Sequence, residues 1–165
     1  MKRKHKLYVR PKKAYEKIRI KEENSLAAKY GLKNKREIWK TIAKVSYFRR
    51  RAKALAQAPA EEQEVFFSKL RKIGLNTNSI SDVLDLKVEN ILERRLPTIV
   101  VKKKLAETSR QARQFVVHKK ILVNGKVVNT PSYIVSTEEE NNITLRTKAK
   151  AVKVEVNAEG GPANG

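Results

Sequence analysis

The chain has 165 residues, of which 38 are Lys or Arg and 17 are Asp or Glu, so its formal net charge at pH 7 is +21. Solubility alone needs a net charge of only about 2–8 in magnitude. The excess therefore indicates a polyanionic partner, and phosphate backbones supply one. A hydrophobic content of 40% argues against wholesale disorder. No apolar run approaches the roughly 20 residues of a membrane span.

Cysteine is absent and there are two histidines, His5 and His118, which lie far apart. This composition argues against a zinc site, and we expect neither a metal nor another cofactor. No phosphate-binding loop, dinucleotide fingerprint or convincing pair of catalytic carboxylates is present. We therefore expect a protein that is not an enzyme and has no catalytic residues.

The positive charge is unevenly distributed. Residues 1–57 hold 20 Lys and Arg against 4 Asp and Glu, residues 58–86 hold 3 against 5, and residues 87–165 hold 15 against 8. We therefore expect two basic parts joined by an acidic connector that does not contact a polyanion. The first 13 residues have little apolar content, which predicts an extended basic arm that becomes ordered on its partner.

Helical signals begin near Tyr15 and end at about Tyr30, before Gly31. The longest predicted helix covers residues 34–57, with Asn34 as its cap and Glu37 near the capping-box position. Its apolar stripe is expected to consist of Ile38, Ile42, Val45, Ala52 and Ala56.

A basic stripe is expected on the opposite side of this helix. Such a stripe can be merely a solvated face, but three consecutive arginines favour phosphate contact, because guanidinium groups bind phosphate bidentately. The candidate contacts on this helix are Lys40, Lys44, Tyr47, Arg49, Arg50 and Arg51.

Pro59 opens the next predicted helix, with glutamates in its first turns and Gly74 at its end. Its expected apolar positions are Phe66, Leu70 and Ile73. Residues 75–81 are polar and are predicted to form a turn.

Three short helices are predicted next, over residues 87–96, 98–105 and 109–119. Thr108 caps the third, with Gln111 at the capping-box position. One side of this helix carries Ala112, Phe115, Val116 and the Lys119 stem, which suits a core. The other side carries Arg110, Arg113 and Gln114, with His118 at its margin. Two arginines one turn apart can grip successive phosphates, and the neighbouring polar groups can contact sugar or base edges.

Two β-branched runs flank Asn124-Gly125, which predicts a tight hairpin. Residues 142–145 predict a further strand of the same small antiparallel sheet. The fold class is therefore expected to be α+β, with a compact RNA-binding module of helices on a small sheet. The tip residues Asn124 and Lys126 are placed where an RNA backbone can approach.

The module carries Arg94-Arg95-Leu96, Thr108 to Gln114, Val117-His118-Lys119, Val123 to Val128 and Pro131-Ser132-Tyr133. Together they resemble the S-four RNA-binding domain. Upstream, Lys29 to Glu37 and Asp82 to Leu86 resemble the archaeal and eukaryotic branch of the small-subunit ribosomal protein four family. The resemblance covers roughly residues 2–150.

The resemblance implies a structural constituent of the small ribosomal subunit that is cytoplasmic, in the ribosome. It implies direct, early binding to small-subunit ribosomal RNA and a position near the path by which mRNA enters, with a role in translational accuracy. Its expected partners are that RNA, neighbouring small-subunit proteins and mRNA itself, with no membrane. The RNA contacts carried over onto the module are Arg94, Arg110, Gln111, Arg113, Gln114, His118, Lys119 and Lys126. Some members hold a zinc ion by cysteines near the N-terminus, which this chain cannot do.

The expected organisation has four parts. An extended basic arm covers residues 1–13, a helical domain 14–86, an S-four domain 87–150 and a flexible tail 151–165.

Single residues admit two roles. No nucleophile or carboxylate is evident beside His118, so hydrogen bonding or packing is favoured over catalysis. Trp39 lies nearer the apolar stripe, which favours a core role over base stacking. Tyr47 and Tyr133 are the more open candidates for stacking on RNA bases. The Glu138 to Glu140 run is expected to be a solvated loop.

Two other functions remain open from sequence. One is a factor that visits ribosomal particles during assembly or stress. The other is the accessory module of an RNA-modifying enzyme, although residues 1–86 are too basic, too helical and too short to form a catalytic domain.

Overall fold

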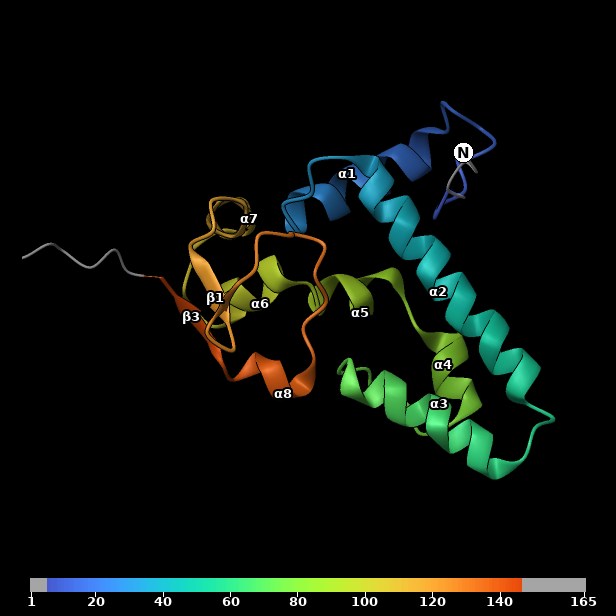
Figure 1. Cartoon of the computed structure of the whole chain (residues 1–165). Helices are drawn as coiled ribbons and strands as arrows, with labels where there is room; N and C mark the ends of the chain where they lie inside the picture. Colours follow the sequence, from blue (N-terminus) through green and yellow to red (C-terminus); the bar gives the residue numbers. More distant parts are fainter. Residues whose placement is uncertain (1–5, 147–165) are drawn as a thin grey trace, which may run out of the picture.

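The computed structural model describes residues 6–146. The chain forms a helical part followed by a mixed part (Figure 1), which confirms the α+β class. The helical part contains α1 (Lys17–Lys29), α2 (Lys35–Leu55), α3 (Ala60–Lys72), α4 (Ile80–Asp85) and α5 (Val88–Glu93). The mixed part contains α6 (Leu96–Lys102), α7 (Ser109–Val117), β1 (Ile121–Val123), β2 (Lys126–Val127), α8 (Thr137–Glu140) and β3 (Ile143–Leu145). The tail predicted at 151–165 lies outside the described residues.

Helix α2 is the central element of the helical part, and α1, α3, α4 and α5 all pack against it. Its buried residues alternate at spacings of three and four, so they form one stripe that faces the interior. They are Ile38, Thr41, Val45, Phe48, Ala52 and Leu55. The predicted apolar stripe was wrong at two positions. Ile42 is 43% exposed and Ala56 is exposed, because the stripe follows Thr41, Phe48 and Leu55 instead.

Helix α1 is held to α2 by a buried carboxylate. Glu23 is 4% exposed, and its carboxylate accepts hydrogen bonds from Arg19 at 2.7 Å and from the Trp39 indole at 2.9 Å. Lys35 lies 3.5 Å from the same carboxylate. Trp39 therefore has the structural role that the sequence favours, because its one polar atom is used inside the protein.

Residues 75–81 are more structured than predicted. Leu75 and Thr77 are buried, at 3% and 0% exposure, and the segment leads directly into α4. Ser79 caps that helix, and the Asp82 carboxylate accepts from the Ser79 amide in return. This capping box was missed because α4 spans only six residues, too few to show an apolar period.

The mixed part is built on a three-stranded antiparallel sheet with the strand order β2-β1-β3. Asn124 and Gly125 both have positive φ, at 50° and 74°, as a tight hairpin of this kind requires. The predicted hairpin and the third strand are both confirmed. Helices α6 and α7 cover the sheet with a core of mainly aliphatic side chains.

Two further details differ from the sequence predictions. Helix α7 ends at Val117 rather than Lys119, because Lys119 adopts a left-handed conformation with φ of 57°. The glutamates at 138–140 belong to the short helix α8, not to a loop. Ser136 caps α8, and the Glu139 carboxylate completes its capping box.

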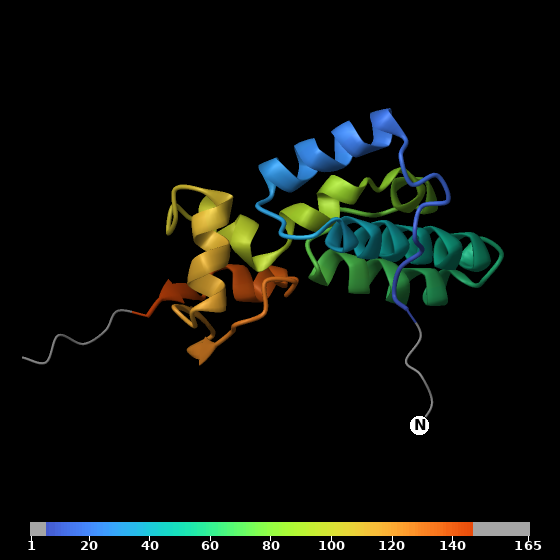
Figure 2. The ribbon, with the colours of Figure 1, turned by 90° about the horizontal axis from the view of Figure 1, so that it is seen from above.

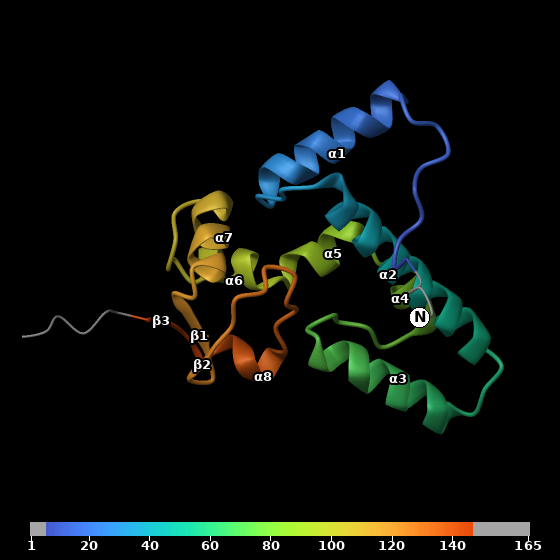
Figure 3. The same cartoon turned by 45° about the horizontal axis from the view of Figure 1, so that its top comes forward.

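Within residues 6–146, the buried apolar side chains form two hydrophobic cores, one before and one after Arg94 in the sequence. One core runs from Val45 to Ile91, and the other from Leu96 to Ile143. Figure 2 shows the two parts side by side, with α7 and the sheet on the left and α1 to α5 on the right. In Figure 3 the arm before α1 returns to cross α2, and α8 lies at the end of α3.

Candidate nucleic-acid interface

Helix α7 is positioned by its cap and by its buried side. The Thr108 hydroxyl accepts a hydrogen bond from the Gln111 amide at 3.2 Å, and the Gln111 side chain accepts from the Glu107 amide at 2.9 Å. Ala112 and Val116 are completely buried in the core above the sheet. Gln111 is therefore mainly a capping residue, and its side-chain amide nitrogen is the group left for a ligand.

The opposite side of α7 is open to solvent. Arg110, Gln114 and His118 are all exposed and follow one another at four-residue spacing, so they form a row along the helix. Within residues 6–146, no ion pair or side-chain hydrogen bond engages these three side chains. Lys119 and Lys126 are also exposed. The structure thus brings together five of the predicted contacts on the exposed surface of one module.

Arg113 does not belong to this row, although the sequence placed it there. Its guanidinium forms two hydrogen bonds with the Glu37 carboxylate, at 2.8 and 3.1 Å. Glu37 also accepts from Arg95 at 2.6 Å, and the Arg95 side chain is only 7% exposed. Glu37 therefore joins α2 to the mixed part through two arginines. The sequence predicted a capping box at the start of α2, with Asn34 as the cap and Glu37 as its partner. Neither side chain caps the helix.

The pKa of Glu37 reflects these contacts. Burial by itself would raise the pKa, but the hydrogen bonds from Arg113 and Arg95 hold it below the ordinary value of 4.5. A carboxylate with a lowered folded-state pKa stabilises the fold above its unfolded pKa, and this contribution is lost as the pH falls through the folded value.

We therefore expect the stability advantage of the wild type over Glu37→Gln to be complete at pH 7. It should shrink as the pH falls below 4.5 and disappear once Glu37 is protonated in the folded protein. Urea unfolding of both proteins at pH 7 and at pH 3 measures this difference. An advantage that is equal at both pH values would contradict the assigned ionisation.

Arg94 lies mostly inside the protein rather than on the exposed surface of the module. Its guanidinium donates to the Ile73 carbonyl at 2.8 Å, to the Val135 carbonyl at 3.2 Å and to Glu140 at 2.7 Å. Its side chain is 12% exposed. These contacts tie the end of α3 to the α8 region, so Arg94 is not carried into the proposed binding surface.

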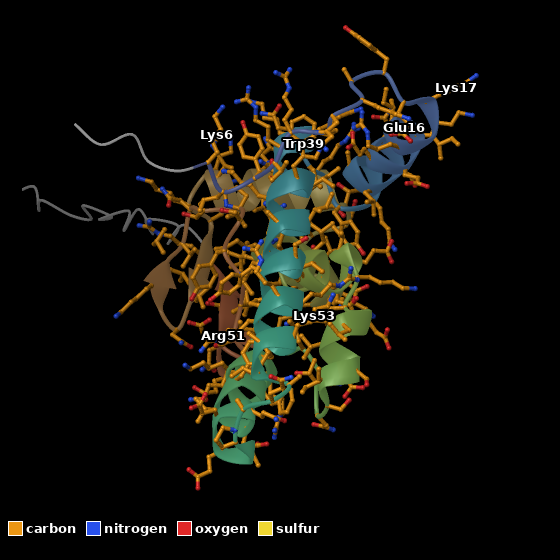
Figure 4. The ribbon with its side chains drawn as sticks, turned by 90° about the vertical axis from the view of Figure 1, so that its right-hand side faces the viewer. Lys6, Glu16, Lys17, Trp39, Arg51 and Lys53 are labelled. Atoms are coloured by element: carbon orange, nitrogen blue, oxygen red, sulfur yellow. The ribbon has the colours of Figure 1, made fainter. Side chains whose placement is uncertain are left out.

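The basic stripe of α2 is mostly exposed. Lys40, Tyr47, Arg50 and Arg51 are open to solvent, whereas Lys44 is half-buried. Arg49 donates to the Leu86 carbonyl at 2.9 Å and so anchors α2 to the chain after α4. Figure 4 shows α2 along its length, with Trp39 near its start and Arg51 and Lys53 on different sides of its second half.

The structure adds two exposed residues that the sequence analysis did not select. Lys33 and Arg36 lie in and just after the turn between α1 and α2. This turn packs closely on the start of α7, since the Ser109 hydroxyl donates to the Lys29 carbonyl at 2.8 Å. A Cβ on Gly31 would lie 2.8 Å from the Ser109 backbone. Arg36 precedes Lys40 by one helical turn, a spacing that could have revealed it.

Tyr133 is less available than predicted. Its hydroxyl donates to Glu139 at 2.7 Å, and its ring packs against the core of the mixed part. Among the described residues, no group of three or more His, Cys, Asp or Glu side chains could hold a metal ion. No helix in that part of the chain is both long and apolar enough to cross a membrane.

Comparison with known proteins agrees with this arrangement. The S4 domain family model matches residues 94–141, which span Arg94 to the end of α8. Small ribosomal subunit protein uS4 of Nanoarchaeum equitans is 48% identical over 141 residues, covering 81% of this chain and 78% of the relative. The uS4 proteins of Methanococcus aeolicus and Saccharolobus islandicus are each 47% identical, over 133 and 134 residues. They cover 76% and 77% of this chain, and 75% and 74% of those relatives.

The helices on a small sheet and the matched segment define an S4-domain protein. The identity and coverage go further, and the chain belongs to the family of small ribosomal subunit protein uS4, in its archaeal type. It is therefore a structural, non-enzymatic protein of the small ribosomal subunit that binds ribosomal RNA.

Proposed function

We propose that the chain binds small-subunit ribosomal RNA through two adjoining surfaces. One is the exposed row of α7 with the hairpin tip, made of Arg110, Gln114, His118, Lys119 and Lys126. The other is the exposed stripe of α2 with the preceding turn, made of Lys33, Arg36, Lys40, Tyr47, Arg50 and Arg51. The observation that carries this proposal is the two-sided nature of α7, which has a fully buried aliphatic side and an exposed row without partners in the described residues.

The chemistry of the row suits structured RNA. An exposed arginine binds phosphate bidentately, and Gln114 and His118 supply hydrogen bonds that can reach sugar hydroxyls or base edges. The exposed glutamates in the first turns of α3, Glu61, Glu62 and Glu64, would repel phosphate, and α3 lies apart from α7 (Figure 3). The net charge of +21 supports steep, salt-dependent association.

The finer role rests on family resemblance. We propose early binding during subunit assembly, a position near the path by which mRNA enters, contacts with mRNA and neighbouring small-subunit proteins, and an effect on translational accuracy. The native protein should then occur in mature cytoplasmic small subunits at one copy each. An assembly or stress factor would instead occur mainly on immature particles, so quantifying the protein in purified subunits separates the two roles.

The α7 row can be tested without disturbing the fold. Arg110→Ala with Gln114→Ala should weaken binding to small-subunit ribosomal RNA by about tenfold or more, because a charge-assisted phosphate contact is lost. It should also lower the slope of log affinity against log salt by about one. Filter binding at several salt concentrations, with circular dichroism as a folding check, measures both effects.

Arg71→Ala is the matched control, because Arg71 is an exposed arginine on α3, where it pairs with Glu64. It should leave both the affinity and the salt slope nearly unchanged. Arg113 is deliberately kept intact, since its removal would leave Glu37 short of a partner. Equal losses in the α7 variant and the control would show that binding follows total charge and not this surface.

A further inference from the structure

A groove of about 740 Å³ lies between α2 and the loop that precedes α8. The α2 wall carries Lys40, Lys44 and Tyr47, and the facing wall carries Pro131, Ser132 and Ile134. Residues 6–9 of the arm also line the groove, as do Glu37 and the two arginines that it holds. The groove therefore joins the helical part to the mixed part, and neither part forms it alone.

The electrostatics of the groove call for an anion. The negative charge of Glu37 is already balanced by Arg95 and Arg113. Lys44 is half-buried, and burial lowers its pKa, because the charged ammonium group has lost part of its hydration. Its Nζ lies 5.8 Å from the centroid of the Phe48 ring, and no carboxylate pairs with it within residues 6–146. Lys6 and Lys40 add further positive charge.

The apolar surface of the groove calls for more than a phosphate. Tyr47 is 58% exposed, and Pro131, Ile134 and Ile91 also line the groove. A phosphate group gains nothing from these surfaces, whereas a nucleobase stacks favourably on an aromatic ring. The volume lies within the range of about 300–1,000 Å³ that is typical of small-ligand pockets, and a double helix is too wide to enter it.

We propose that this groove binds a single unstacked nucleotide of small-subunit ribosomal RNA, with its phosphate at Lys40 and Lys44 and its base against Tyr47. This inference rests on the proposed RNA binding and deepens it, since it assigns an unpaired nucleotide of the RNA to this groove. A paired base is stacked inside an RNA helix that cannot enter the groove, so only an unpaired, splayed-out base can reach Tyr47. The site is separate from the α7 row, because no residue of that row lines the groove.

The base contact is tested by a pair of variants at one position. Tyr47→Ala should raise the dissociation constant for small-subunit ribosomal RNA by at least about fivefold, because the stacking surface is lost. Tyr47→Phe keeps that surface and should bind within about twofold of the wild type. Irradiation of the complex at short ultraviolet wavelength, followed by digestion and mass spectrometry, should also yield a nucleotide attached to the peptide that contains Tyr47.

The phosphate contact is tested by removing a charge. Lys44→Met keeps the buried stem, so the fold should remain at least as stable, while the salt slope falls by about one. Lys69→Met, on α3 and outside both proposed surfaces, is the control and should leave the slope unchanged.

The outcomes are distinguishable. A wild-type chain that fails to bind ribosomal RNA would overturn the proposed function itself. A wild type that binds, together with unchanged affinity in Tyr47→Ala and no adduct at its peptide, would overturn only the groove. Equal weakening by Tyr47→Phe and Tyr47→Ala would also overturn it, because stacking would then not be the interaction.

Discussion

Replacing Glu37 with alanine is expected to lower the free energy of unfolding by about 3–5 kcal/mol. The change leaves the Arg95 guanidinium buried without a counter-charge, and it removes both hydrogen bonds from Arg113 to the carboxylate. A buried, unpaired arginine is far more costly than the lost attraction alone. Urea unfolding at pH 7, followed by circular dichroism, measures the difference.

Glu93→Ala is the matched control for this prediction. Glu93 pairs with Lys102 at 3.3 Å, but both side chains are about half exposed, at 46% and 51%. An exposed pair contributes only about 0–1 kcal/mol, so this variant should remain close to the wild type. If the two glutamate variants lost equal stability, Glu37 would not be the buried link between the two parts.

Replacing Arg94 with alanine should lower the free energy of unfolding by about 2–4 kcal/mol. Two main-chain carbonyls, of Ile73 and Val135, lose a charged donor, and Glu140 loses its partner. The same unfolding experiment applies, with Arg71→Ala as the control. Arg71 pairs with Glu64 on the surface, so its loss should cost about 1 kcal/mol or less.

The RNA-binding behaviour of Arg94→Ala separates the structural role from direct contact. At a temperature where the variant is folded, the salt slope of its RNA binding should equal that of the wild type. A slope lowered by about one, with little loss of stability, would return Arg94 to the set of phosphate contacts.

The contacts of Glu37 with its two arginines and the contacts of Arg94 have the same consequence for RNA binding. Glu37 and its arginines fix the start of α2 against α7, and Arg94 fixes the end of α3 against α8. The exposed row of α7 and the stripe of α2 are therefore held in one relative orientation before RNA binds. A rigid, preorganised surface loses less entropy on binding than two modules that move independently. The charged side chains that fix this orientation are largely buried where the two parts meet.

Much of the local structure follows from nearby residues. The Asn124-Gly125 hairpin, the Thr108 cap and the stops at Gly31 and Gly74 are set by short-range chemistry, and all are present. The exposure of Arg110, Gln114 and His118 also follows from the period of α7. The helix α4 was missed because six residues show no clear period, and its capping box is the signal that remained.

Charge and periodicity are local properties of the chain, so the sequence alone predicts the polyanion preference, the α+β class, the order of most elements and the row of α7. Which arginines remain free depends on the tertiary structure. Arg94, Arg95 and Arg113 look like surface arginines in the sequence, yet carboxylates and carbonyls far along the chain engage them. A side chain's partner depends on which segments the fold brings together, and no local pattern records that.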